Sequence, residues 1–155
     1  MVIKVISGGQ TGVDRAALDV AMENDIACGG WCPKGRQAED GPIDAKYPLV
    51  ETDTLSVQQR TQNNVRDSDG TLILSSGPLG GGTLKTAAIA TRMKKPLLVV
   101  NLAEKPDMES VVKWVEKANV KVLNVAGPRA SESPDIYQKA HAFLKELLVG
   151  NEEEA

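Results

Sequence analysis

The sequence contains few of the residues that build metal sites or disulfide frameworks. Its 155 residues include two cysteines, Cys28 and Cys32, and one histidine, His141. Two cysteines do not make the disulfide framework of a small secreted domain, and a zinc site needs further cysteine or histidine ligands. A Ser-His-Asp triad is equally unsupported, because His141 falls inside the last predicted helix and the sequence has no G-x-S-x-G turn. We therefore expect no metal site built from protein ligands.

Long hydrophobic runs and an excess of basic charge are also missing. The longest apolar runs are far too short to span a bilayer, and 18 basic residues stand against 21 acidic ones. Proteins that bind nucleic acid or membrane surfaces carry a basic excess, so we expect neither partner. A predicted strand starts at Val2, where a signal peptide would lie, and we expect a cytoplasmic protein.

The order of the predicted elements indicates the fold class. Short β-branched runs alternate with longer amphipathic ones, which predicts strands at 2–6, 26–30, 71–75, 97–101 and 122–126, a short edge strand at 49–52, and helices at 14–24, 56–67, 83–94, 107–119 and 134–148. This alternation predicts an α/β fold, a Rossmann-like three-layer sandwich with a mostly parallel sheet of five to six strands. Ser133 and Pro134 are expected to cap and start the last helix. We expect residues 1–150 to form a single Rossmann-like ligand-binding domain and residues 151–155 an acidic frayed tail.

Three glycine-rich loops, at 7–12, 75–83 and 126–131, each follow a predicted strand and precede a helix. Glycine lets backbone N–H groups approach an anion closely, and the following helix adds its positive end. Ligands of parallel sheets bind beyond the carboxyl ends of the strands, where all three loops should meet. For any one loop, the alternative to a ligand site is a tight connection between strand and helix. Three such loops together predict a phosphate site. Its candidate residues are Gly8, Gly9, Gln10, Thr11, Gly12, Gly80, Gly81, Gly82 and Thr83, with charge from Arg15 and Arg129.

Two polar segments lie between these loops. The first, at 31–42, contains Lys34, Arg36, Glu39 and Asp40, which would clamp a polar ligand and set its specificity, with a solvated surface loop as the alternative. Trp31 at its start would stack on a flat heterocycle. The second is the helix at 56–67, which is so polar that it is either exposed or faces a site. Neither the Walker pattern nor the dinucleotide fingerprint is present, which disfavours P-loop ATP and standard NAD binding.

Five motifs in order carry a family resemblance: SGGQTGVDRAALD, GGWCPKGRQAEDGPI, QRTQNNVRDSDGTLILS, GPLGGGT and NVAGPRASESP. Together they resemble the molybdenum carrier family, a circularly permuted YpsA-like branch of the SLOG superfamily of Rossmann-like proteins. The resemblance runs from about Ile3 to Leu148. It implies a binding protein for the molybdenum cofactor (molybdopterin), a phosphorylated pterin whose dithiolene sulfurs hold the metal. It also implies a homo-oligomer, either a dimer or a tetramer.

The wider superfamily implies two alternatives to a carrier. One is a nucleotide-ligand sensor, and the other is an enzyme that processes nucleotides or nucleoside monophosphates, similar to phosphoribohydrolases. Those hydrolases resemble P-G-G-x-G-T-x-x-E, and Thr86 occupies the glutamate position here. Without that carboxylate the hydrolase chemistry lacks its usual stabiliser, although Glu39 or Asp40 would be a substitute. We therefore expect a carrier or related binding protein for a small phosphorylated molecule, without assigning catalytic residues.

Overall fold

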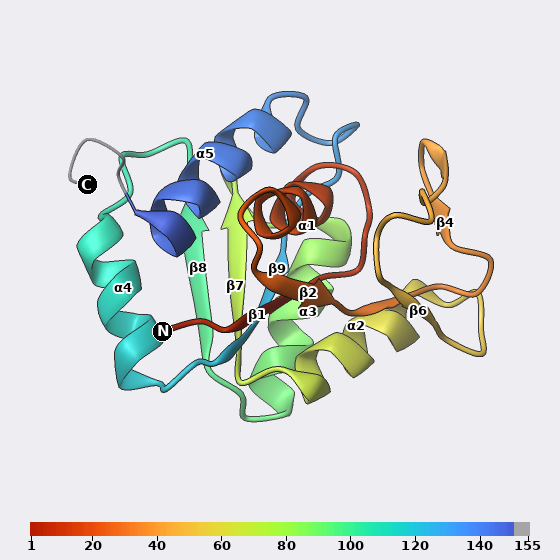
Figure 1. The fold of residues 1–155 in the computed structure, drawn as a ribbon, viewed down its shortest axis with the longest axis horizontal. Helices are drawn as coiled ribbons and strands as arrows, with labels where there is room; N and C mark the ends of the chain where they lie inside the picture. The colour runs from red at the N-terminus through yellow and green to blue at the C-terminus, as the bar shows by residue number, and fades with distance from the viewer. Residues whose placement is uncertain (151–155) are drawn as a thin grey trace.

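The computed structural model describes residues 1–150, so the predicted acidic tail lies outside the described residues. Its centre is a five-stranded sheet in the order β2-β1-β9-β7-β8 (Figure 1). The strands are β1 (Lys4–Ile6), β2 (Ala27–Gly29), β7 (Gly70–Ser75), β8 (Leu97–Asn101) and β9 (Val122–Ala126). All four neighbouring pairs are parallel. The predicted α/β sandwich with a parallel sheet of five to six strands is thus confirmed, with five strands.

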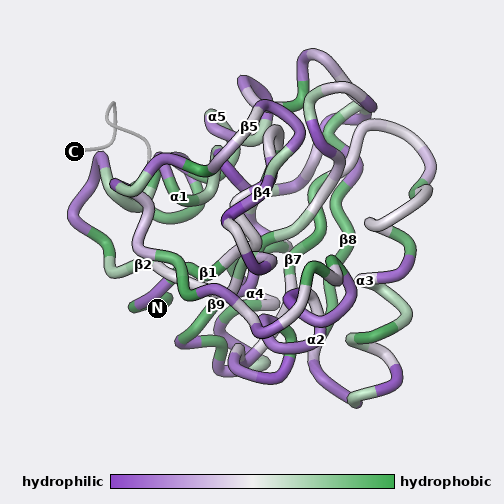
Figure 2. The backbone as a smooth tube through the Cα atoms, turned by 90° about the vertical axis from the view of Figure 1, so that its right-hand side faces the viewer, coloured by the Kyte–Doolittle hydropathy of each residue, from purple (hydrophilic) through white to green (hydrophobic). Residues whose placement is uncertain are grey.

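Helices cover both faces of this sheet (Figure 2). One face carries α1 (Val13–Glu23), α4 (Met108–Lys117) and α5 (Ile136–Val149), whose apolar residues share a cluster with the sheet. The other face carries α2 (Val57–Asp67) and α3 (Gly81–Arg92), which pack together through Val65, Ile89 and Ala90. Every residue of β7 is buried, as expected of a central strand covered on both faces. Across residues 1–150, no helix combines the length and the apolar character that crossing a membrane requires.

The segment between β2 and α2 forms a small annex beside the main sheet. Its elements are β3 (Trp31–Cys32), β4 (Gln37–Ala38), β5 (Gly41–Pro42) and β6 (Val50–Glu51). The strand predicted at 49–52 forms as β6, but it pairs in parallel with β3 and not with the main sheet. The annex has its own apolar cluster, in which Leu49 packs with Ile43 and Tyr47 against Leu18 of α1. This packing keeps the segment from extending the large sheet.

The last helix begins later than predicted. Its N-cap position is Asp135, no side chain caps it, and the predicted Ser133 cap is wrong. The reason is that Ser133 belongs to the preceding turn. Its N–H donates to the carbonyl of Arg129, and its own carbonyl accepts from the N–H of Ile136. The turn thereby joins the loop after β9 to the start of α5.

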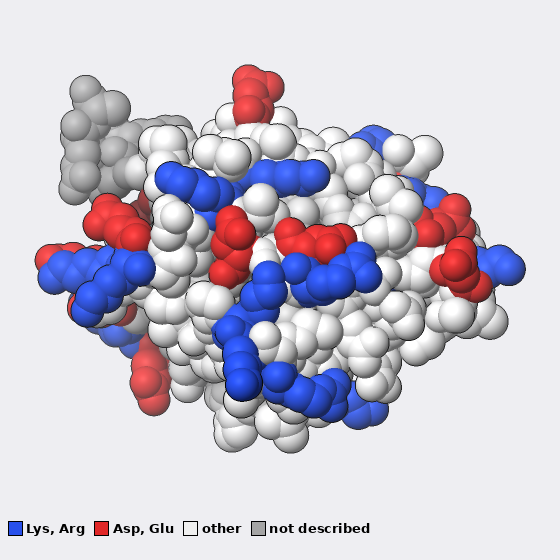
Figure 3. Space-filling model, turned by 90° about the horizontal axis from the view of Figure 1, so that it is seen from below, with Lys and Arg blue, Asp and Glu red and all other residues white. Residues whose placement is uncertain are grey.

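The opposite edge of the molecule, at the amino ends of β7 and β8, is seen in Figure 3. Lysine and arginine side chains on this face lie beside aspartate and glutamate side chains. The two signs are therefore interspersed, as on most solvated protein surfaces.

Candidate functional site

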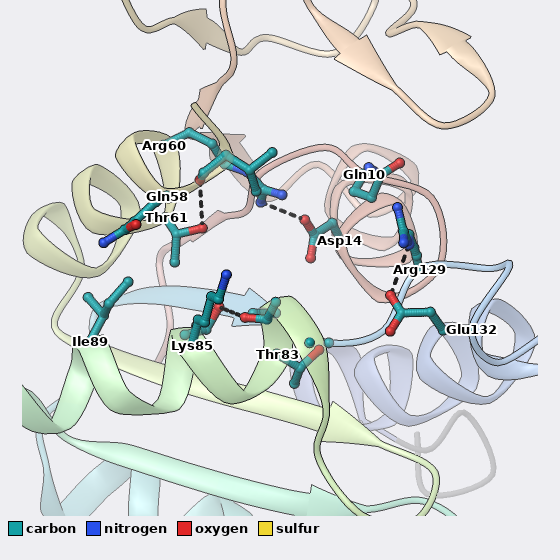
Figure 4. Close-up of a pocket in the computed structure, with 16 residues that line it drawn as sticks. Gln10, Asp14, Gln58, Arg60, Thr61, Thr83, Lys85, Ile89, Arg129 and Glu132 are labelled. Carbon is teal, nitrogen blue, oxygen red and sulfur yellow. Dashed lines mark hydrogen bonds and ion pairs between the residues drawn. The ribbon is translucent and has the colours of Figure 1, made fainter. Parts of the chain in front are cut away.

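A cavity of about 280 Å³ opens at the carboxyl edge of the sheet, between α1, α2 and α3 (Figure 4). This volume is just below the range of small-molecule sites, which span roughly 300–1,000 Å³. The charged residues in its wall are the cations Arg60, Lys85 and Arg129 and the carboxylates Asp14 and Glu132. The other lining residues are Gln10, Val57, Gln58, Thr61, Gly81, Gly82, Thr83, Thr86, Ile89, Ala126 and Gly127.

A buried ion pair joins α1 to α2 in the cavity wall. Arg60 donates from Nη1 to Oδ2 of Asp14 at 3.1 Å, and the two side chains are 13% and 5% exposed. Burial raises the pKa of Asp14 above its ordinary value, while the charge of Arg60 opposes that rise. Nε of Arg60 is buried and has no hydrogen-bond partner among the described residues. An unpaired buried donor costs about 1–3 kcal/mol, so the placement of Arg60 in this wall is destabilising in itself.

The path of Arg60 depends on Gly8, which lies in the first glycine-rich loop. A Cβ built at Gly8 would lie 2.5 Å from Cζ of Arg60 and would overlap Nη1. Contacts under 3.0 Å are essentially never seen for a real Cβ, so any side chain here must displace the guanidinium. The glycine therefore acts by leaving room for the arginine. Gly9 and Gly12 of the same loop have positive φ angles of 78° and 80°, which L side chains rarely adopt.

The N-terminus of α3 lies open at the second glycine-rich loop. Gly80 is the N-cap residue, and no side chain caps the helix. A Cβ at Gly80 or Gly82 would meet nothing within 4 Å, so space lies next to the first turn. The first N–H groups of a helix have no partner within it, and they carry the positive end of the helix dipole. With Lys85 one turn further on, this end of the cavity is suited to an anion.

The predicted site residues divide between the cavity and its surroundings. Gln10, Gly81, Gly82, Thr83 and Arg129 line the cavity. Gly8 lines a smaller hollow beside it, together with Asp14 and Arg60. The structure therefore brings together one residue or more from each of the three glycine-rich loops, as the parallel fold requires.

The remaining predicted residues bind other parts of the protein. Arg15 donates from Nε to the carbonyl of Gly9 at 3.0 Å and forms a double hydrogen bond with the carboxylate of Asp40. That guanidinium lowers the pKa of Asp40 below its ordinary value. Both residues lie outside the set that lines the cavity. Their contacts tie the hairpin of β4 and β5 to the start of α1.

Glu39 at the tip of the same hairpin holds it to two loops. It accepts hydrogen bonds from the hydroxyls of Thr11 and Ser131 and from the N–H of Ser131. These bonds, together with the charge of Arg129, lower the pKa of Glu39. Its own N–H donates to the side chain of Gln10 at 2.9 Å. The hairpin tip thus contacts two cavity residues, Gln10 and Arg129, from outside the cavity.

Arg36 and Lys34 also lie away from the cavity. The guanidinium of Arg36 donates to four backbone carbonyls of the annex, those of Ile43, Asp44, Tyr47 and Leu49. Lys34 is exposed, and its N–H donates to the carbonyl of Thr54. Trp31, expected to stack on a ligand, donates from its indole N–H to Asp67 of α2.

Arg36→Ala is expected to lower the free energy of unfolding by about 2–4 kcal/mol, because hydrogen bonds from a charged donor contribute roughly 1.5–3 kcal/mol each and part of this guanidinium is solvated. Urea denaturation measures the change, with Lys34→Ala as the control that keeps the wild-type midpoint. Ligand affinity per folded molecule should stay the same. An Arg36→Ala protein that unfolds like the wild type but loses ligand binding would assign Arg36 to the ligand site, as the sequence predicts.

The polar and charged cavity residues that were not among the predicted ones are Asp14, Gln58, Arg60, Thr61, Lys85, Thr86 and Glu132. The polar helix α2 carried a signal for part of this set. Its sequence allowed either an exposed helix or one that faces a site, and the structure buries Thr61, Asn63 and Asn64. Asn64 further fixes β3, since its side chain accepts from the N–H and donates to the carbonyl of Trp31.

A parallel sheet between two helical layers, with a charged cavity at its carboxyl edge, defines a Rossmann-like α/β protein. The chain belongs to the Circularly permutated YpsA SLOG family, whose model matches residues 5–148, and the family resemblance is confirmed. It is similar to the crystal structure of a "Putative molybdenum carrier protein" from Syntrophus aciditrophicus SB. The two chains are 46% identical over 95% of each, with a TM-score of 0.90. No match was found among curated proteins.

Proposed function

We propose that this protein is a carrier, or a related binding protein, for a phosphorylated small molecule, and that its cargo is the molybdenum cofactor. The charged cavity at the carboxyl edge carries this proposal, because three cations and an open helix N-terminus surround one space. The similarity to a protein described as a molybdenum carrier supports the choice of cargo. Residues 1–150 would act as one ligand-binding domain.

The residues present suit the phosphate end of this cargo. The N–H groups of Gly81, Gly82 and Thr83 would hold phosphate oxygens at the start of α3, with Lys85 and Arg60 supplying charge. The pterin would lie toward Val57 and Ile89, the apolar part of the wall. Residues 1–150 contain no group of three or more His, Cys, Asp or Glu side chains that could hold a metal ion. The dithiolene sulfurs of the cofactor would therefore be the ligands of the metal.

An enzyme acting on nucleoside monophosphates is the second candidate, and the presence of two carboxylates in the cavity wall favours it. Thr86, at the position of the hydrolase glutamate, lines the cavity and donates its hydroxyl to the carbonyl of Gly82. Glu39 and Asp40 bind Thr11, Ser131 and Arg15 instead of facing the cavity. Asp14 and Glu132, however, place two carboxylates in the cavity wall. Either one would be the carboxylate that such a reaction needs.

The experiment that separates these candidates identifies what the purified protein holds. Small molecules released from it are analysed by mass spectrometry, and molybdenum and tungsten are measured on the same sample. A pterin, or its oxidised fluorescent product, with metal near one per chain is the expected result. A nucleotide without metal would overturn the carrier proposal and lead to hydrolysis assays. A protein purified empty is loaded with released cofactor, and failure to bind it in a titration would also overturn the proposal.

A further inference from the structure

We propose that Asp14 makes anion binding in this cavity depend on pH, by taking up a proton when a doubly charged anion binds beside Arg60. Affinity for such anions would then rise as the pH falls. This inference rests on the proposed function, because it assigns a regulatory role to a residue of the same site.

Asp14 is held in a position from which it cannot turn out to solvent. Its side chain is 5% exposed, and it lies in the first turn of α1. Its backbone carbonyl accepts a hydrogen bond from the buried hydroxyl of Ser7 at 2.9 Å. Its carboxylate is joined to Nη1 of Arg60 (Figure 4). Any charge on Asp14 therefore stays in the cavity wall, whatever occupies the cavity.

Among the charged groups around the cavity, Asp14 is the carboxylate that repels a bound anion most directly. Arg60 faces it from α2, and the more distant charge of Arg15 acts on it from the next position of α1. Lys85 lines the cavity from α3, and Arg129 and Glu132 line it from the loop after β9. Glu132 is 41% exposed and pairs with Arg129 at 3.0 Å, so solvent and that arginine screen its charge. Asp14 has no comparable screening by water.

An anion that pairs with Arg60 has two effects on Asp14. The anion takes part of the attraction of Arg60, the cation that offsets the cost of burying the Asp14 carboxylate. It also adds a negative charge near that carboxylate. Both effects favour the neutral form of Asp14, in the same direction as burial itself, which already raises the pKa of this group. Binding and protonation then support each other. The affinity gain is present below the pKa of Asp14 and is lost as the pH rises through it.

Sulfate is the probe for the test, because it remains a dianion throughout the range and any pH dependence comes from the protein. Backbone amide signals of Gly81, Gly82 and Thr83 are followed by NMR during sulfate titrations at about pH 5.5 and about pH 8, a range in which a carboxyl titrates only if its pKa is raised. The wild type is expected to bind about tenfold more tightly at the lower pH, which lies within the ceiling of tenfold per pH unit that uptake of one proton per anion sets.

Asp14→Asn keeps the shape of the side chain but cannot ionise, so its affinity should be independent of pH and at least as high as the best wild-type value. Asp67→Asn is the matched control. Asp67 also pairs with an arginine, Arg66, but lies outside the cavity, so this variant should behave as the wild type does. If Asp14→Asn does not fold, the inference is still tested by a calorimetric measurement on the wild type alone. Calorimetry of sulfate binding in two buffers of different ionisation enthalpy should show net proton uptake.

Four outcomes decide the question. Tighter wild-type binding at low pH that Asp14→Asn abolishes supports the inference, as does proton uptake by the wild type where Asp14→Asn does not fold. The same pH dependence in folded Asp14→Asn overturns it. Sulfate binding that is independent of pH and takes up no proton overturns it, and leaves the proposed anion site standing. No shift of the α3 amide signals with sulfate at either pH, in the wild type and in Asp14→Asn, overturns the anion site together with this inference.

Discussion

Arg60→Ala is expected to lower affinity for the phosphorylated ligand by about 100-fold or more. The guanidinium is the most buried cation of the cavity wall, and its terminal N–H groups would be the donors for a ligand oxyanion. Hydrogen bonds to charged groups contribute about 1.5–3 kcal/mol each, so losing two of them corresponds to roughly two or more factors of ten. Equilibrium titration with the released cofactor, or with a nucleoside monophosphate if that is what copurifies, measures the loss.

The same substitution should destabilise the protein, because it leaves Asp14 buried without its partner. Breaking a buried pair costs about 3–5 kcal/mol when the remaining group stays charged. The pKa of Asp14 is already raised, so the cost should shrink as the pH falls through that pKa and the carboxyl becomes neutral. Urea denaturation without ligand is therefore done first, to give the fraction of Arg60→Ala molecules that is folded. Affinity is then expressed per folded molecule.

Arg15→Ala is the matched control for Arg60→Ala. The sequence places Arg15 at the phosphate, whereas the structure binds it to Gly9 and Asp40. We expect less than about a threefold loss of affinity, since Arg15 lies outside the residues that line the cavity and no ligand contact is removed. If Arg15→Ala loses as much affinity as Arg60→Ala, the cavity between α1, α2 and α3 is not the binding site.

Gly8→Ala is expected to reduce affinity almost as strongly as Arg60→Ala, although it adds only a methyl group. The added Cβ would occupy the space of the Arg60 guanidinium, which must then leave its position beside Asp14. Since Gly8 has no positive φ angle, backbone strain does not explain a loss. Affinity for the ligand and the urea midpoint are measured for the single variant.

A double-mutant cycle tests whether Gly8 acts through Arg60. With Arg60 already shortened to alanine, adding Gly8→Ala should cost little more, because the clash has been removed. The two substitutions are then strongly non-additive, as expected of residues in contact. Additive losses would mean that Gly8 contributes by itself, for example by presenting its N–H group to the ligand as the sequence predicts.

The fold could be predicted from the sequence because its signals are local. The strands β7, β8 and β9 read as continuous β-branched or leucine-rich runs, and the helices between them have apolar stripes. The parallel arrangement follows from their alternation. The later start of α5 was not predictable, because Ser133 satisfies an N-cap pattern locally but is used in a turn with Arg129.

The site could be located only in part, for the reason that its contacts are distant in sequence. The three glycine-rich loops lie at one edge of the sheet, since parallel topology brings the ends of strands together. The Arg60–Asp14 pair joins residues 46 positions apart, on helices whose approach depends on the packing of the whole domain. Likewise, the contacts of Arg15 with Asp40, and of Arg36 with the annex carbonyls, depend on a hairpin path that no periodicity indicates.

The attachment of Trp31 to α2 has a practical consequence. Asn64 holds both backbone groups of Trp31, and Asp67 accepts from its indole N–H, so the ring is fixed to the helix that contains Arg60. The emission of an indole depends on its hydrogen bond and its exposure to water. The protein therefore carries an intrinsic fluorophore attached to a helix that lines its cavity. With Trp114 changed to phenylalanine, a single-tryptophan protein would report the movement of that helix without any added label.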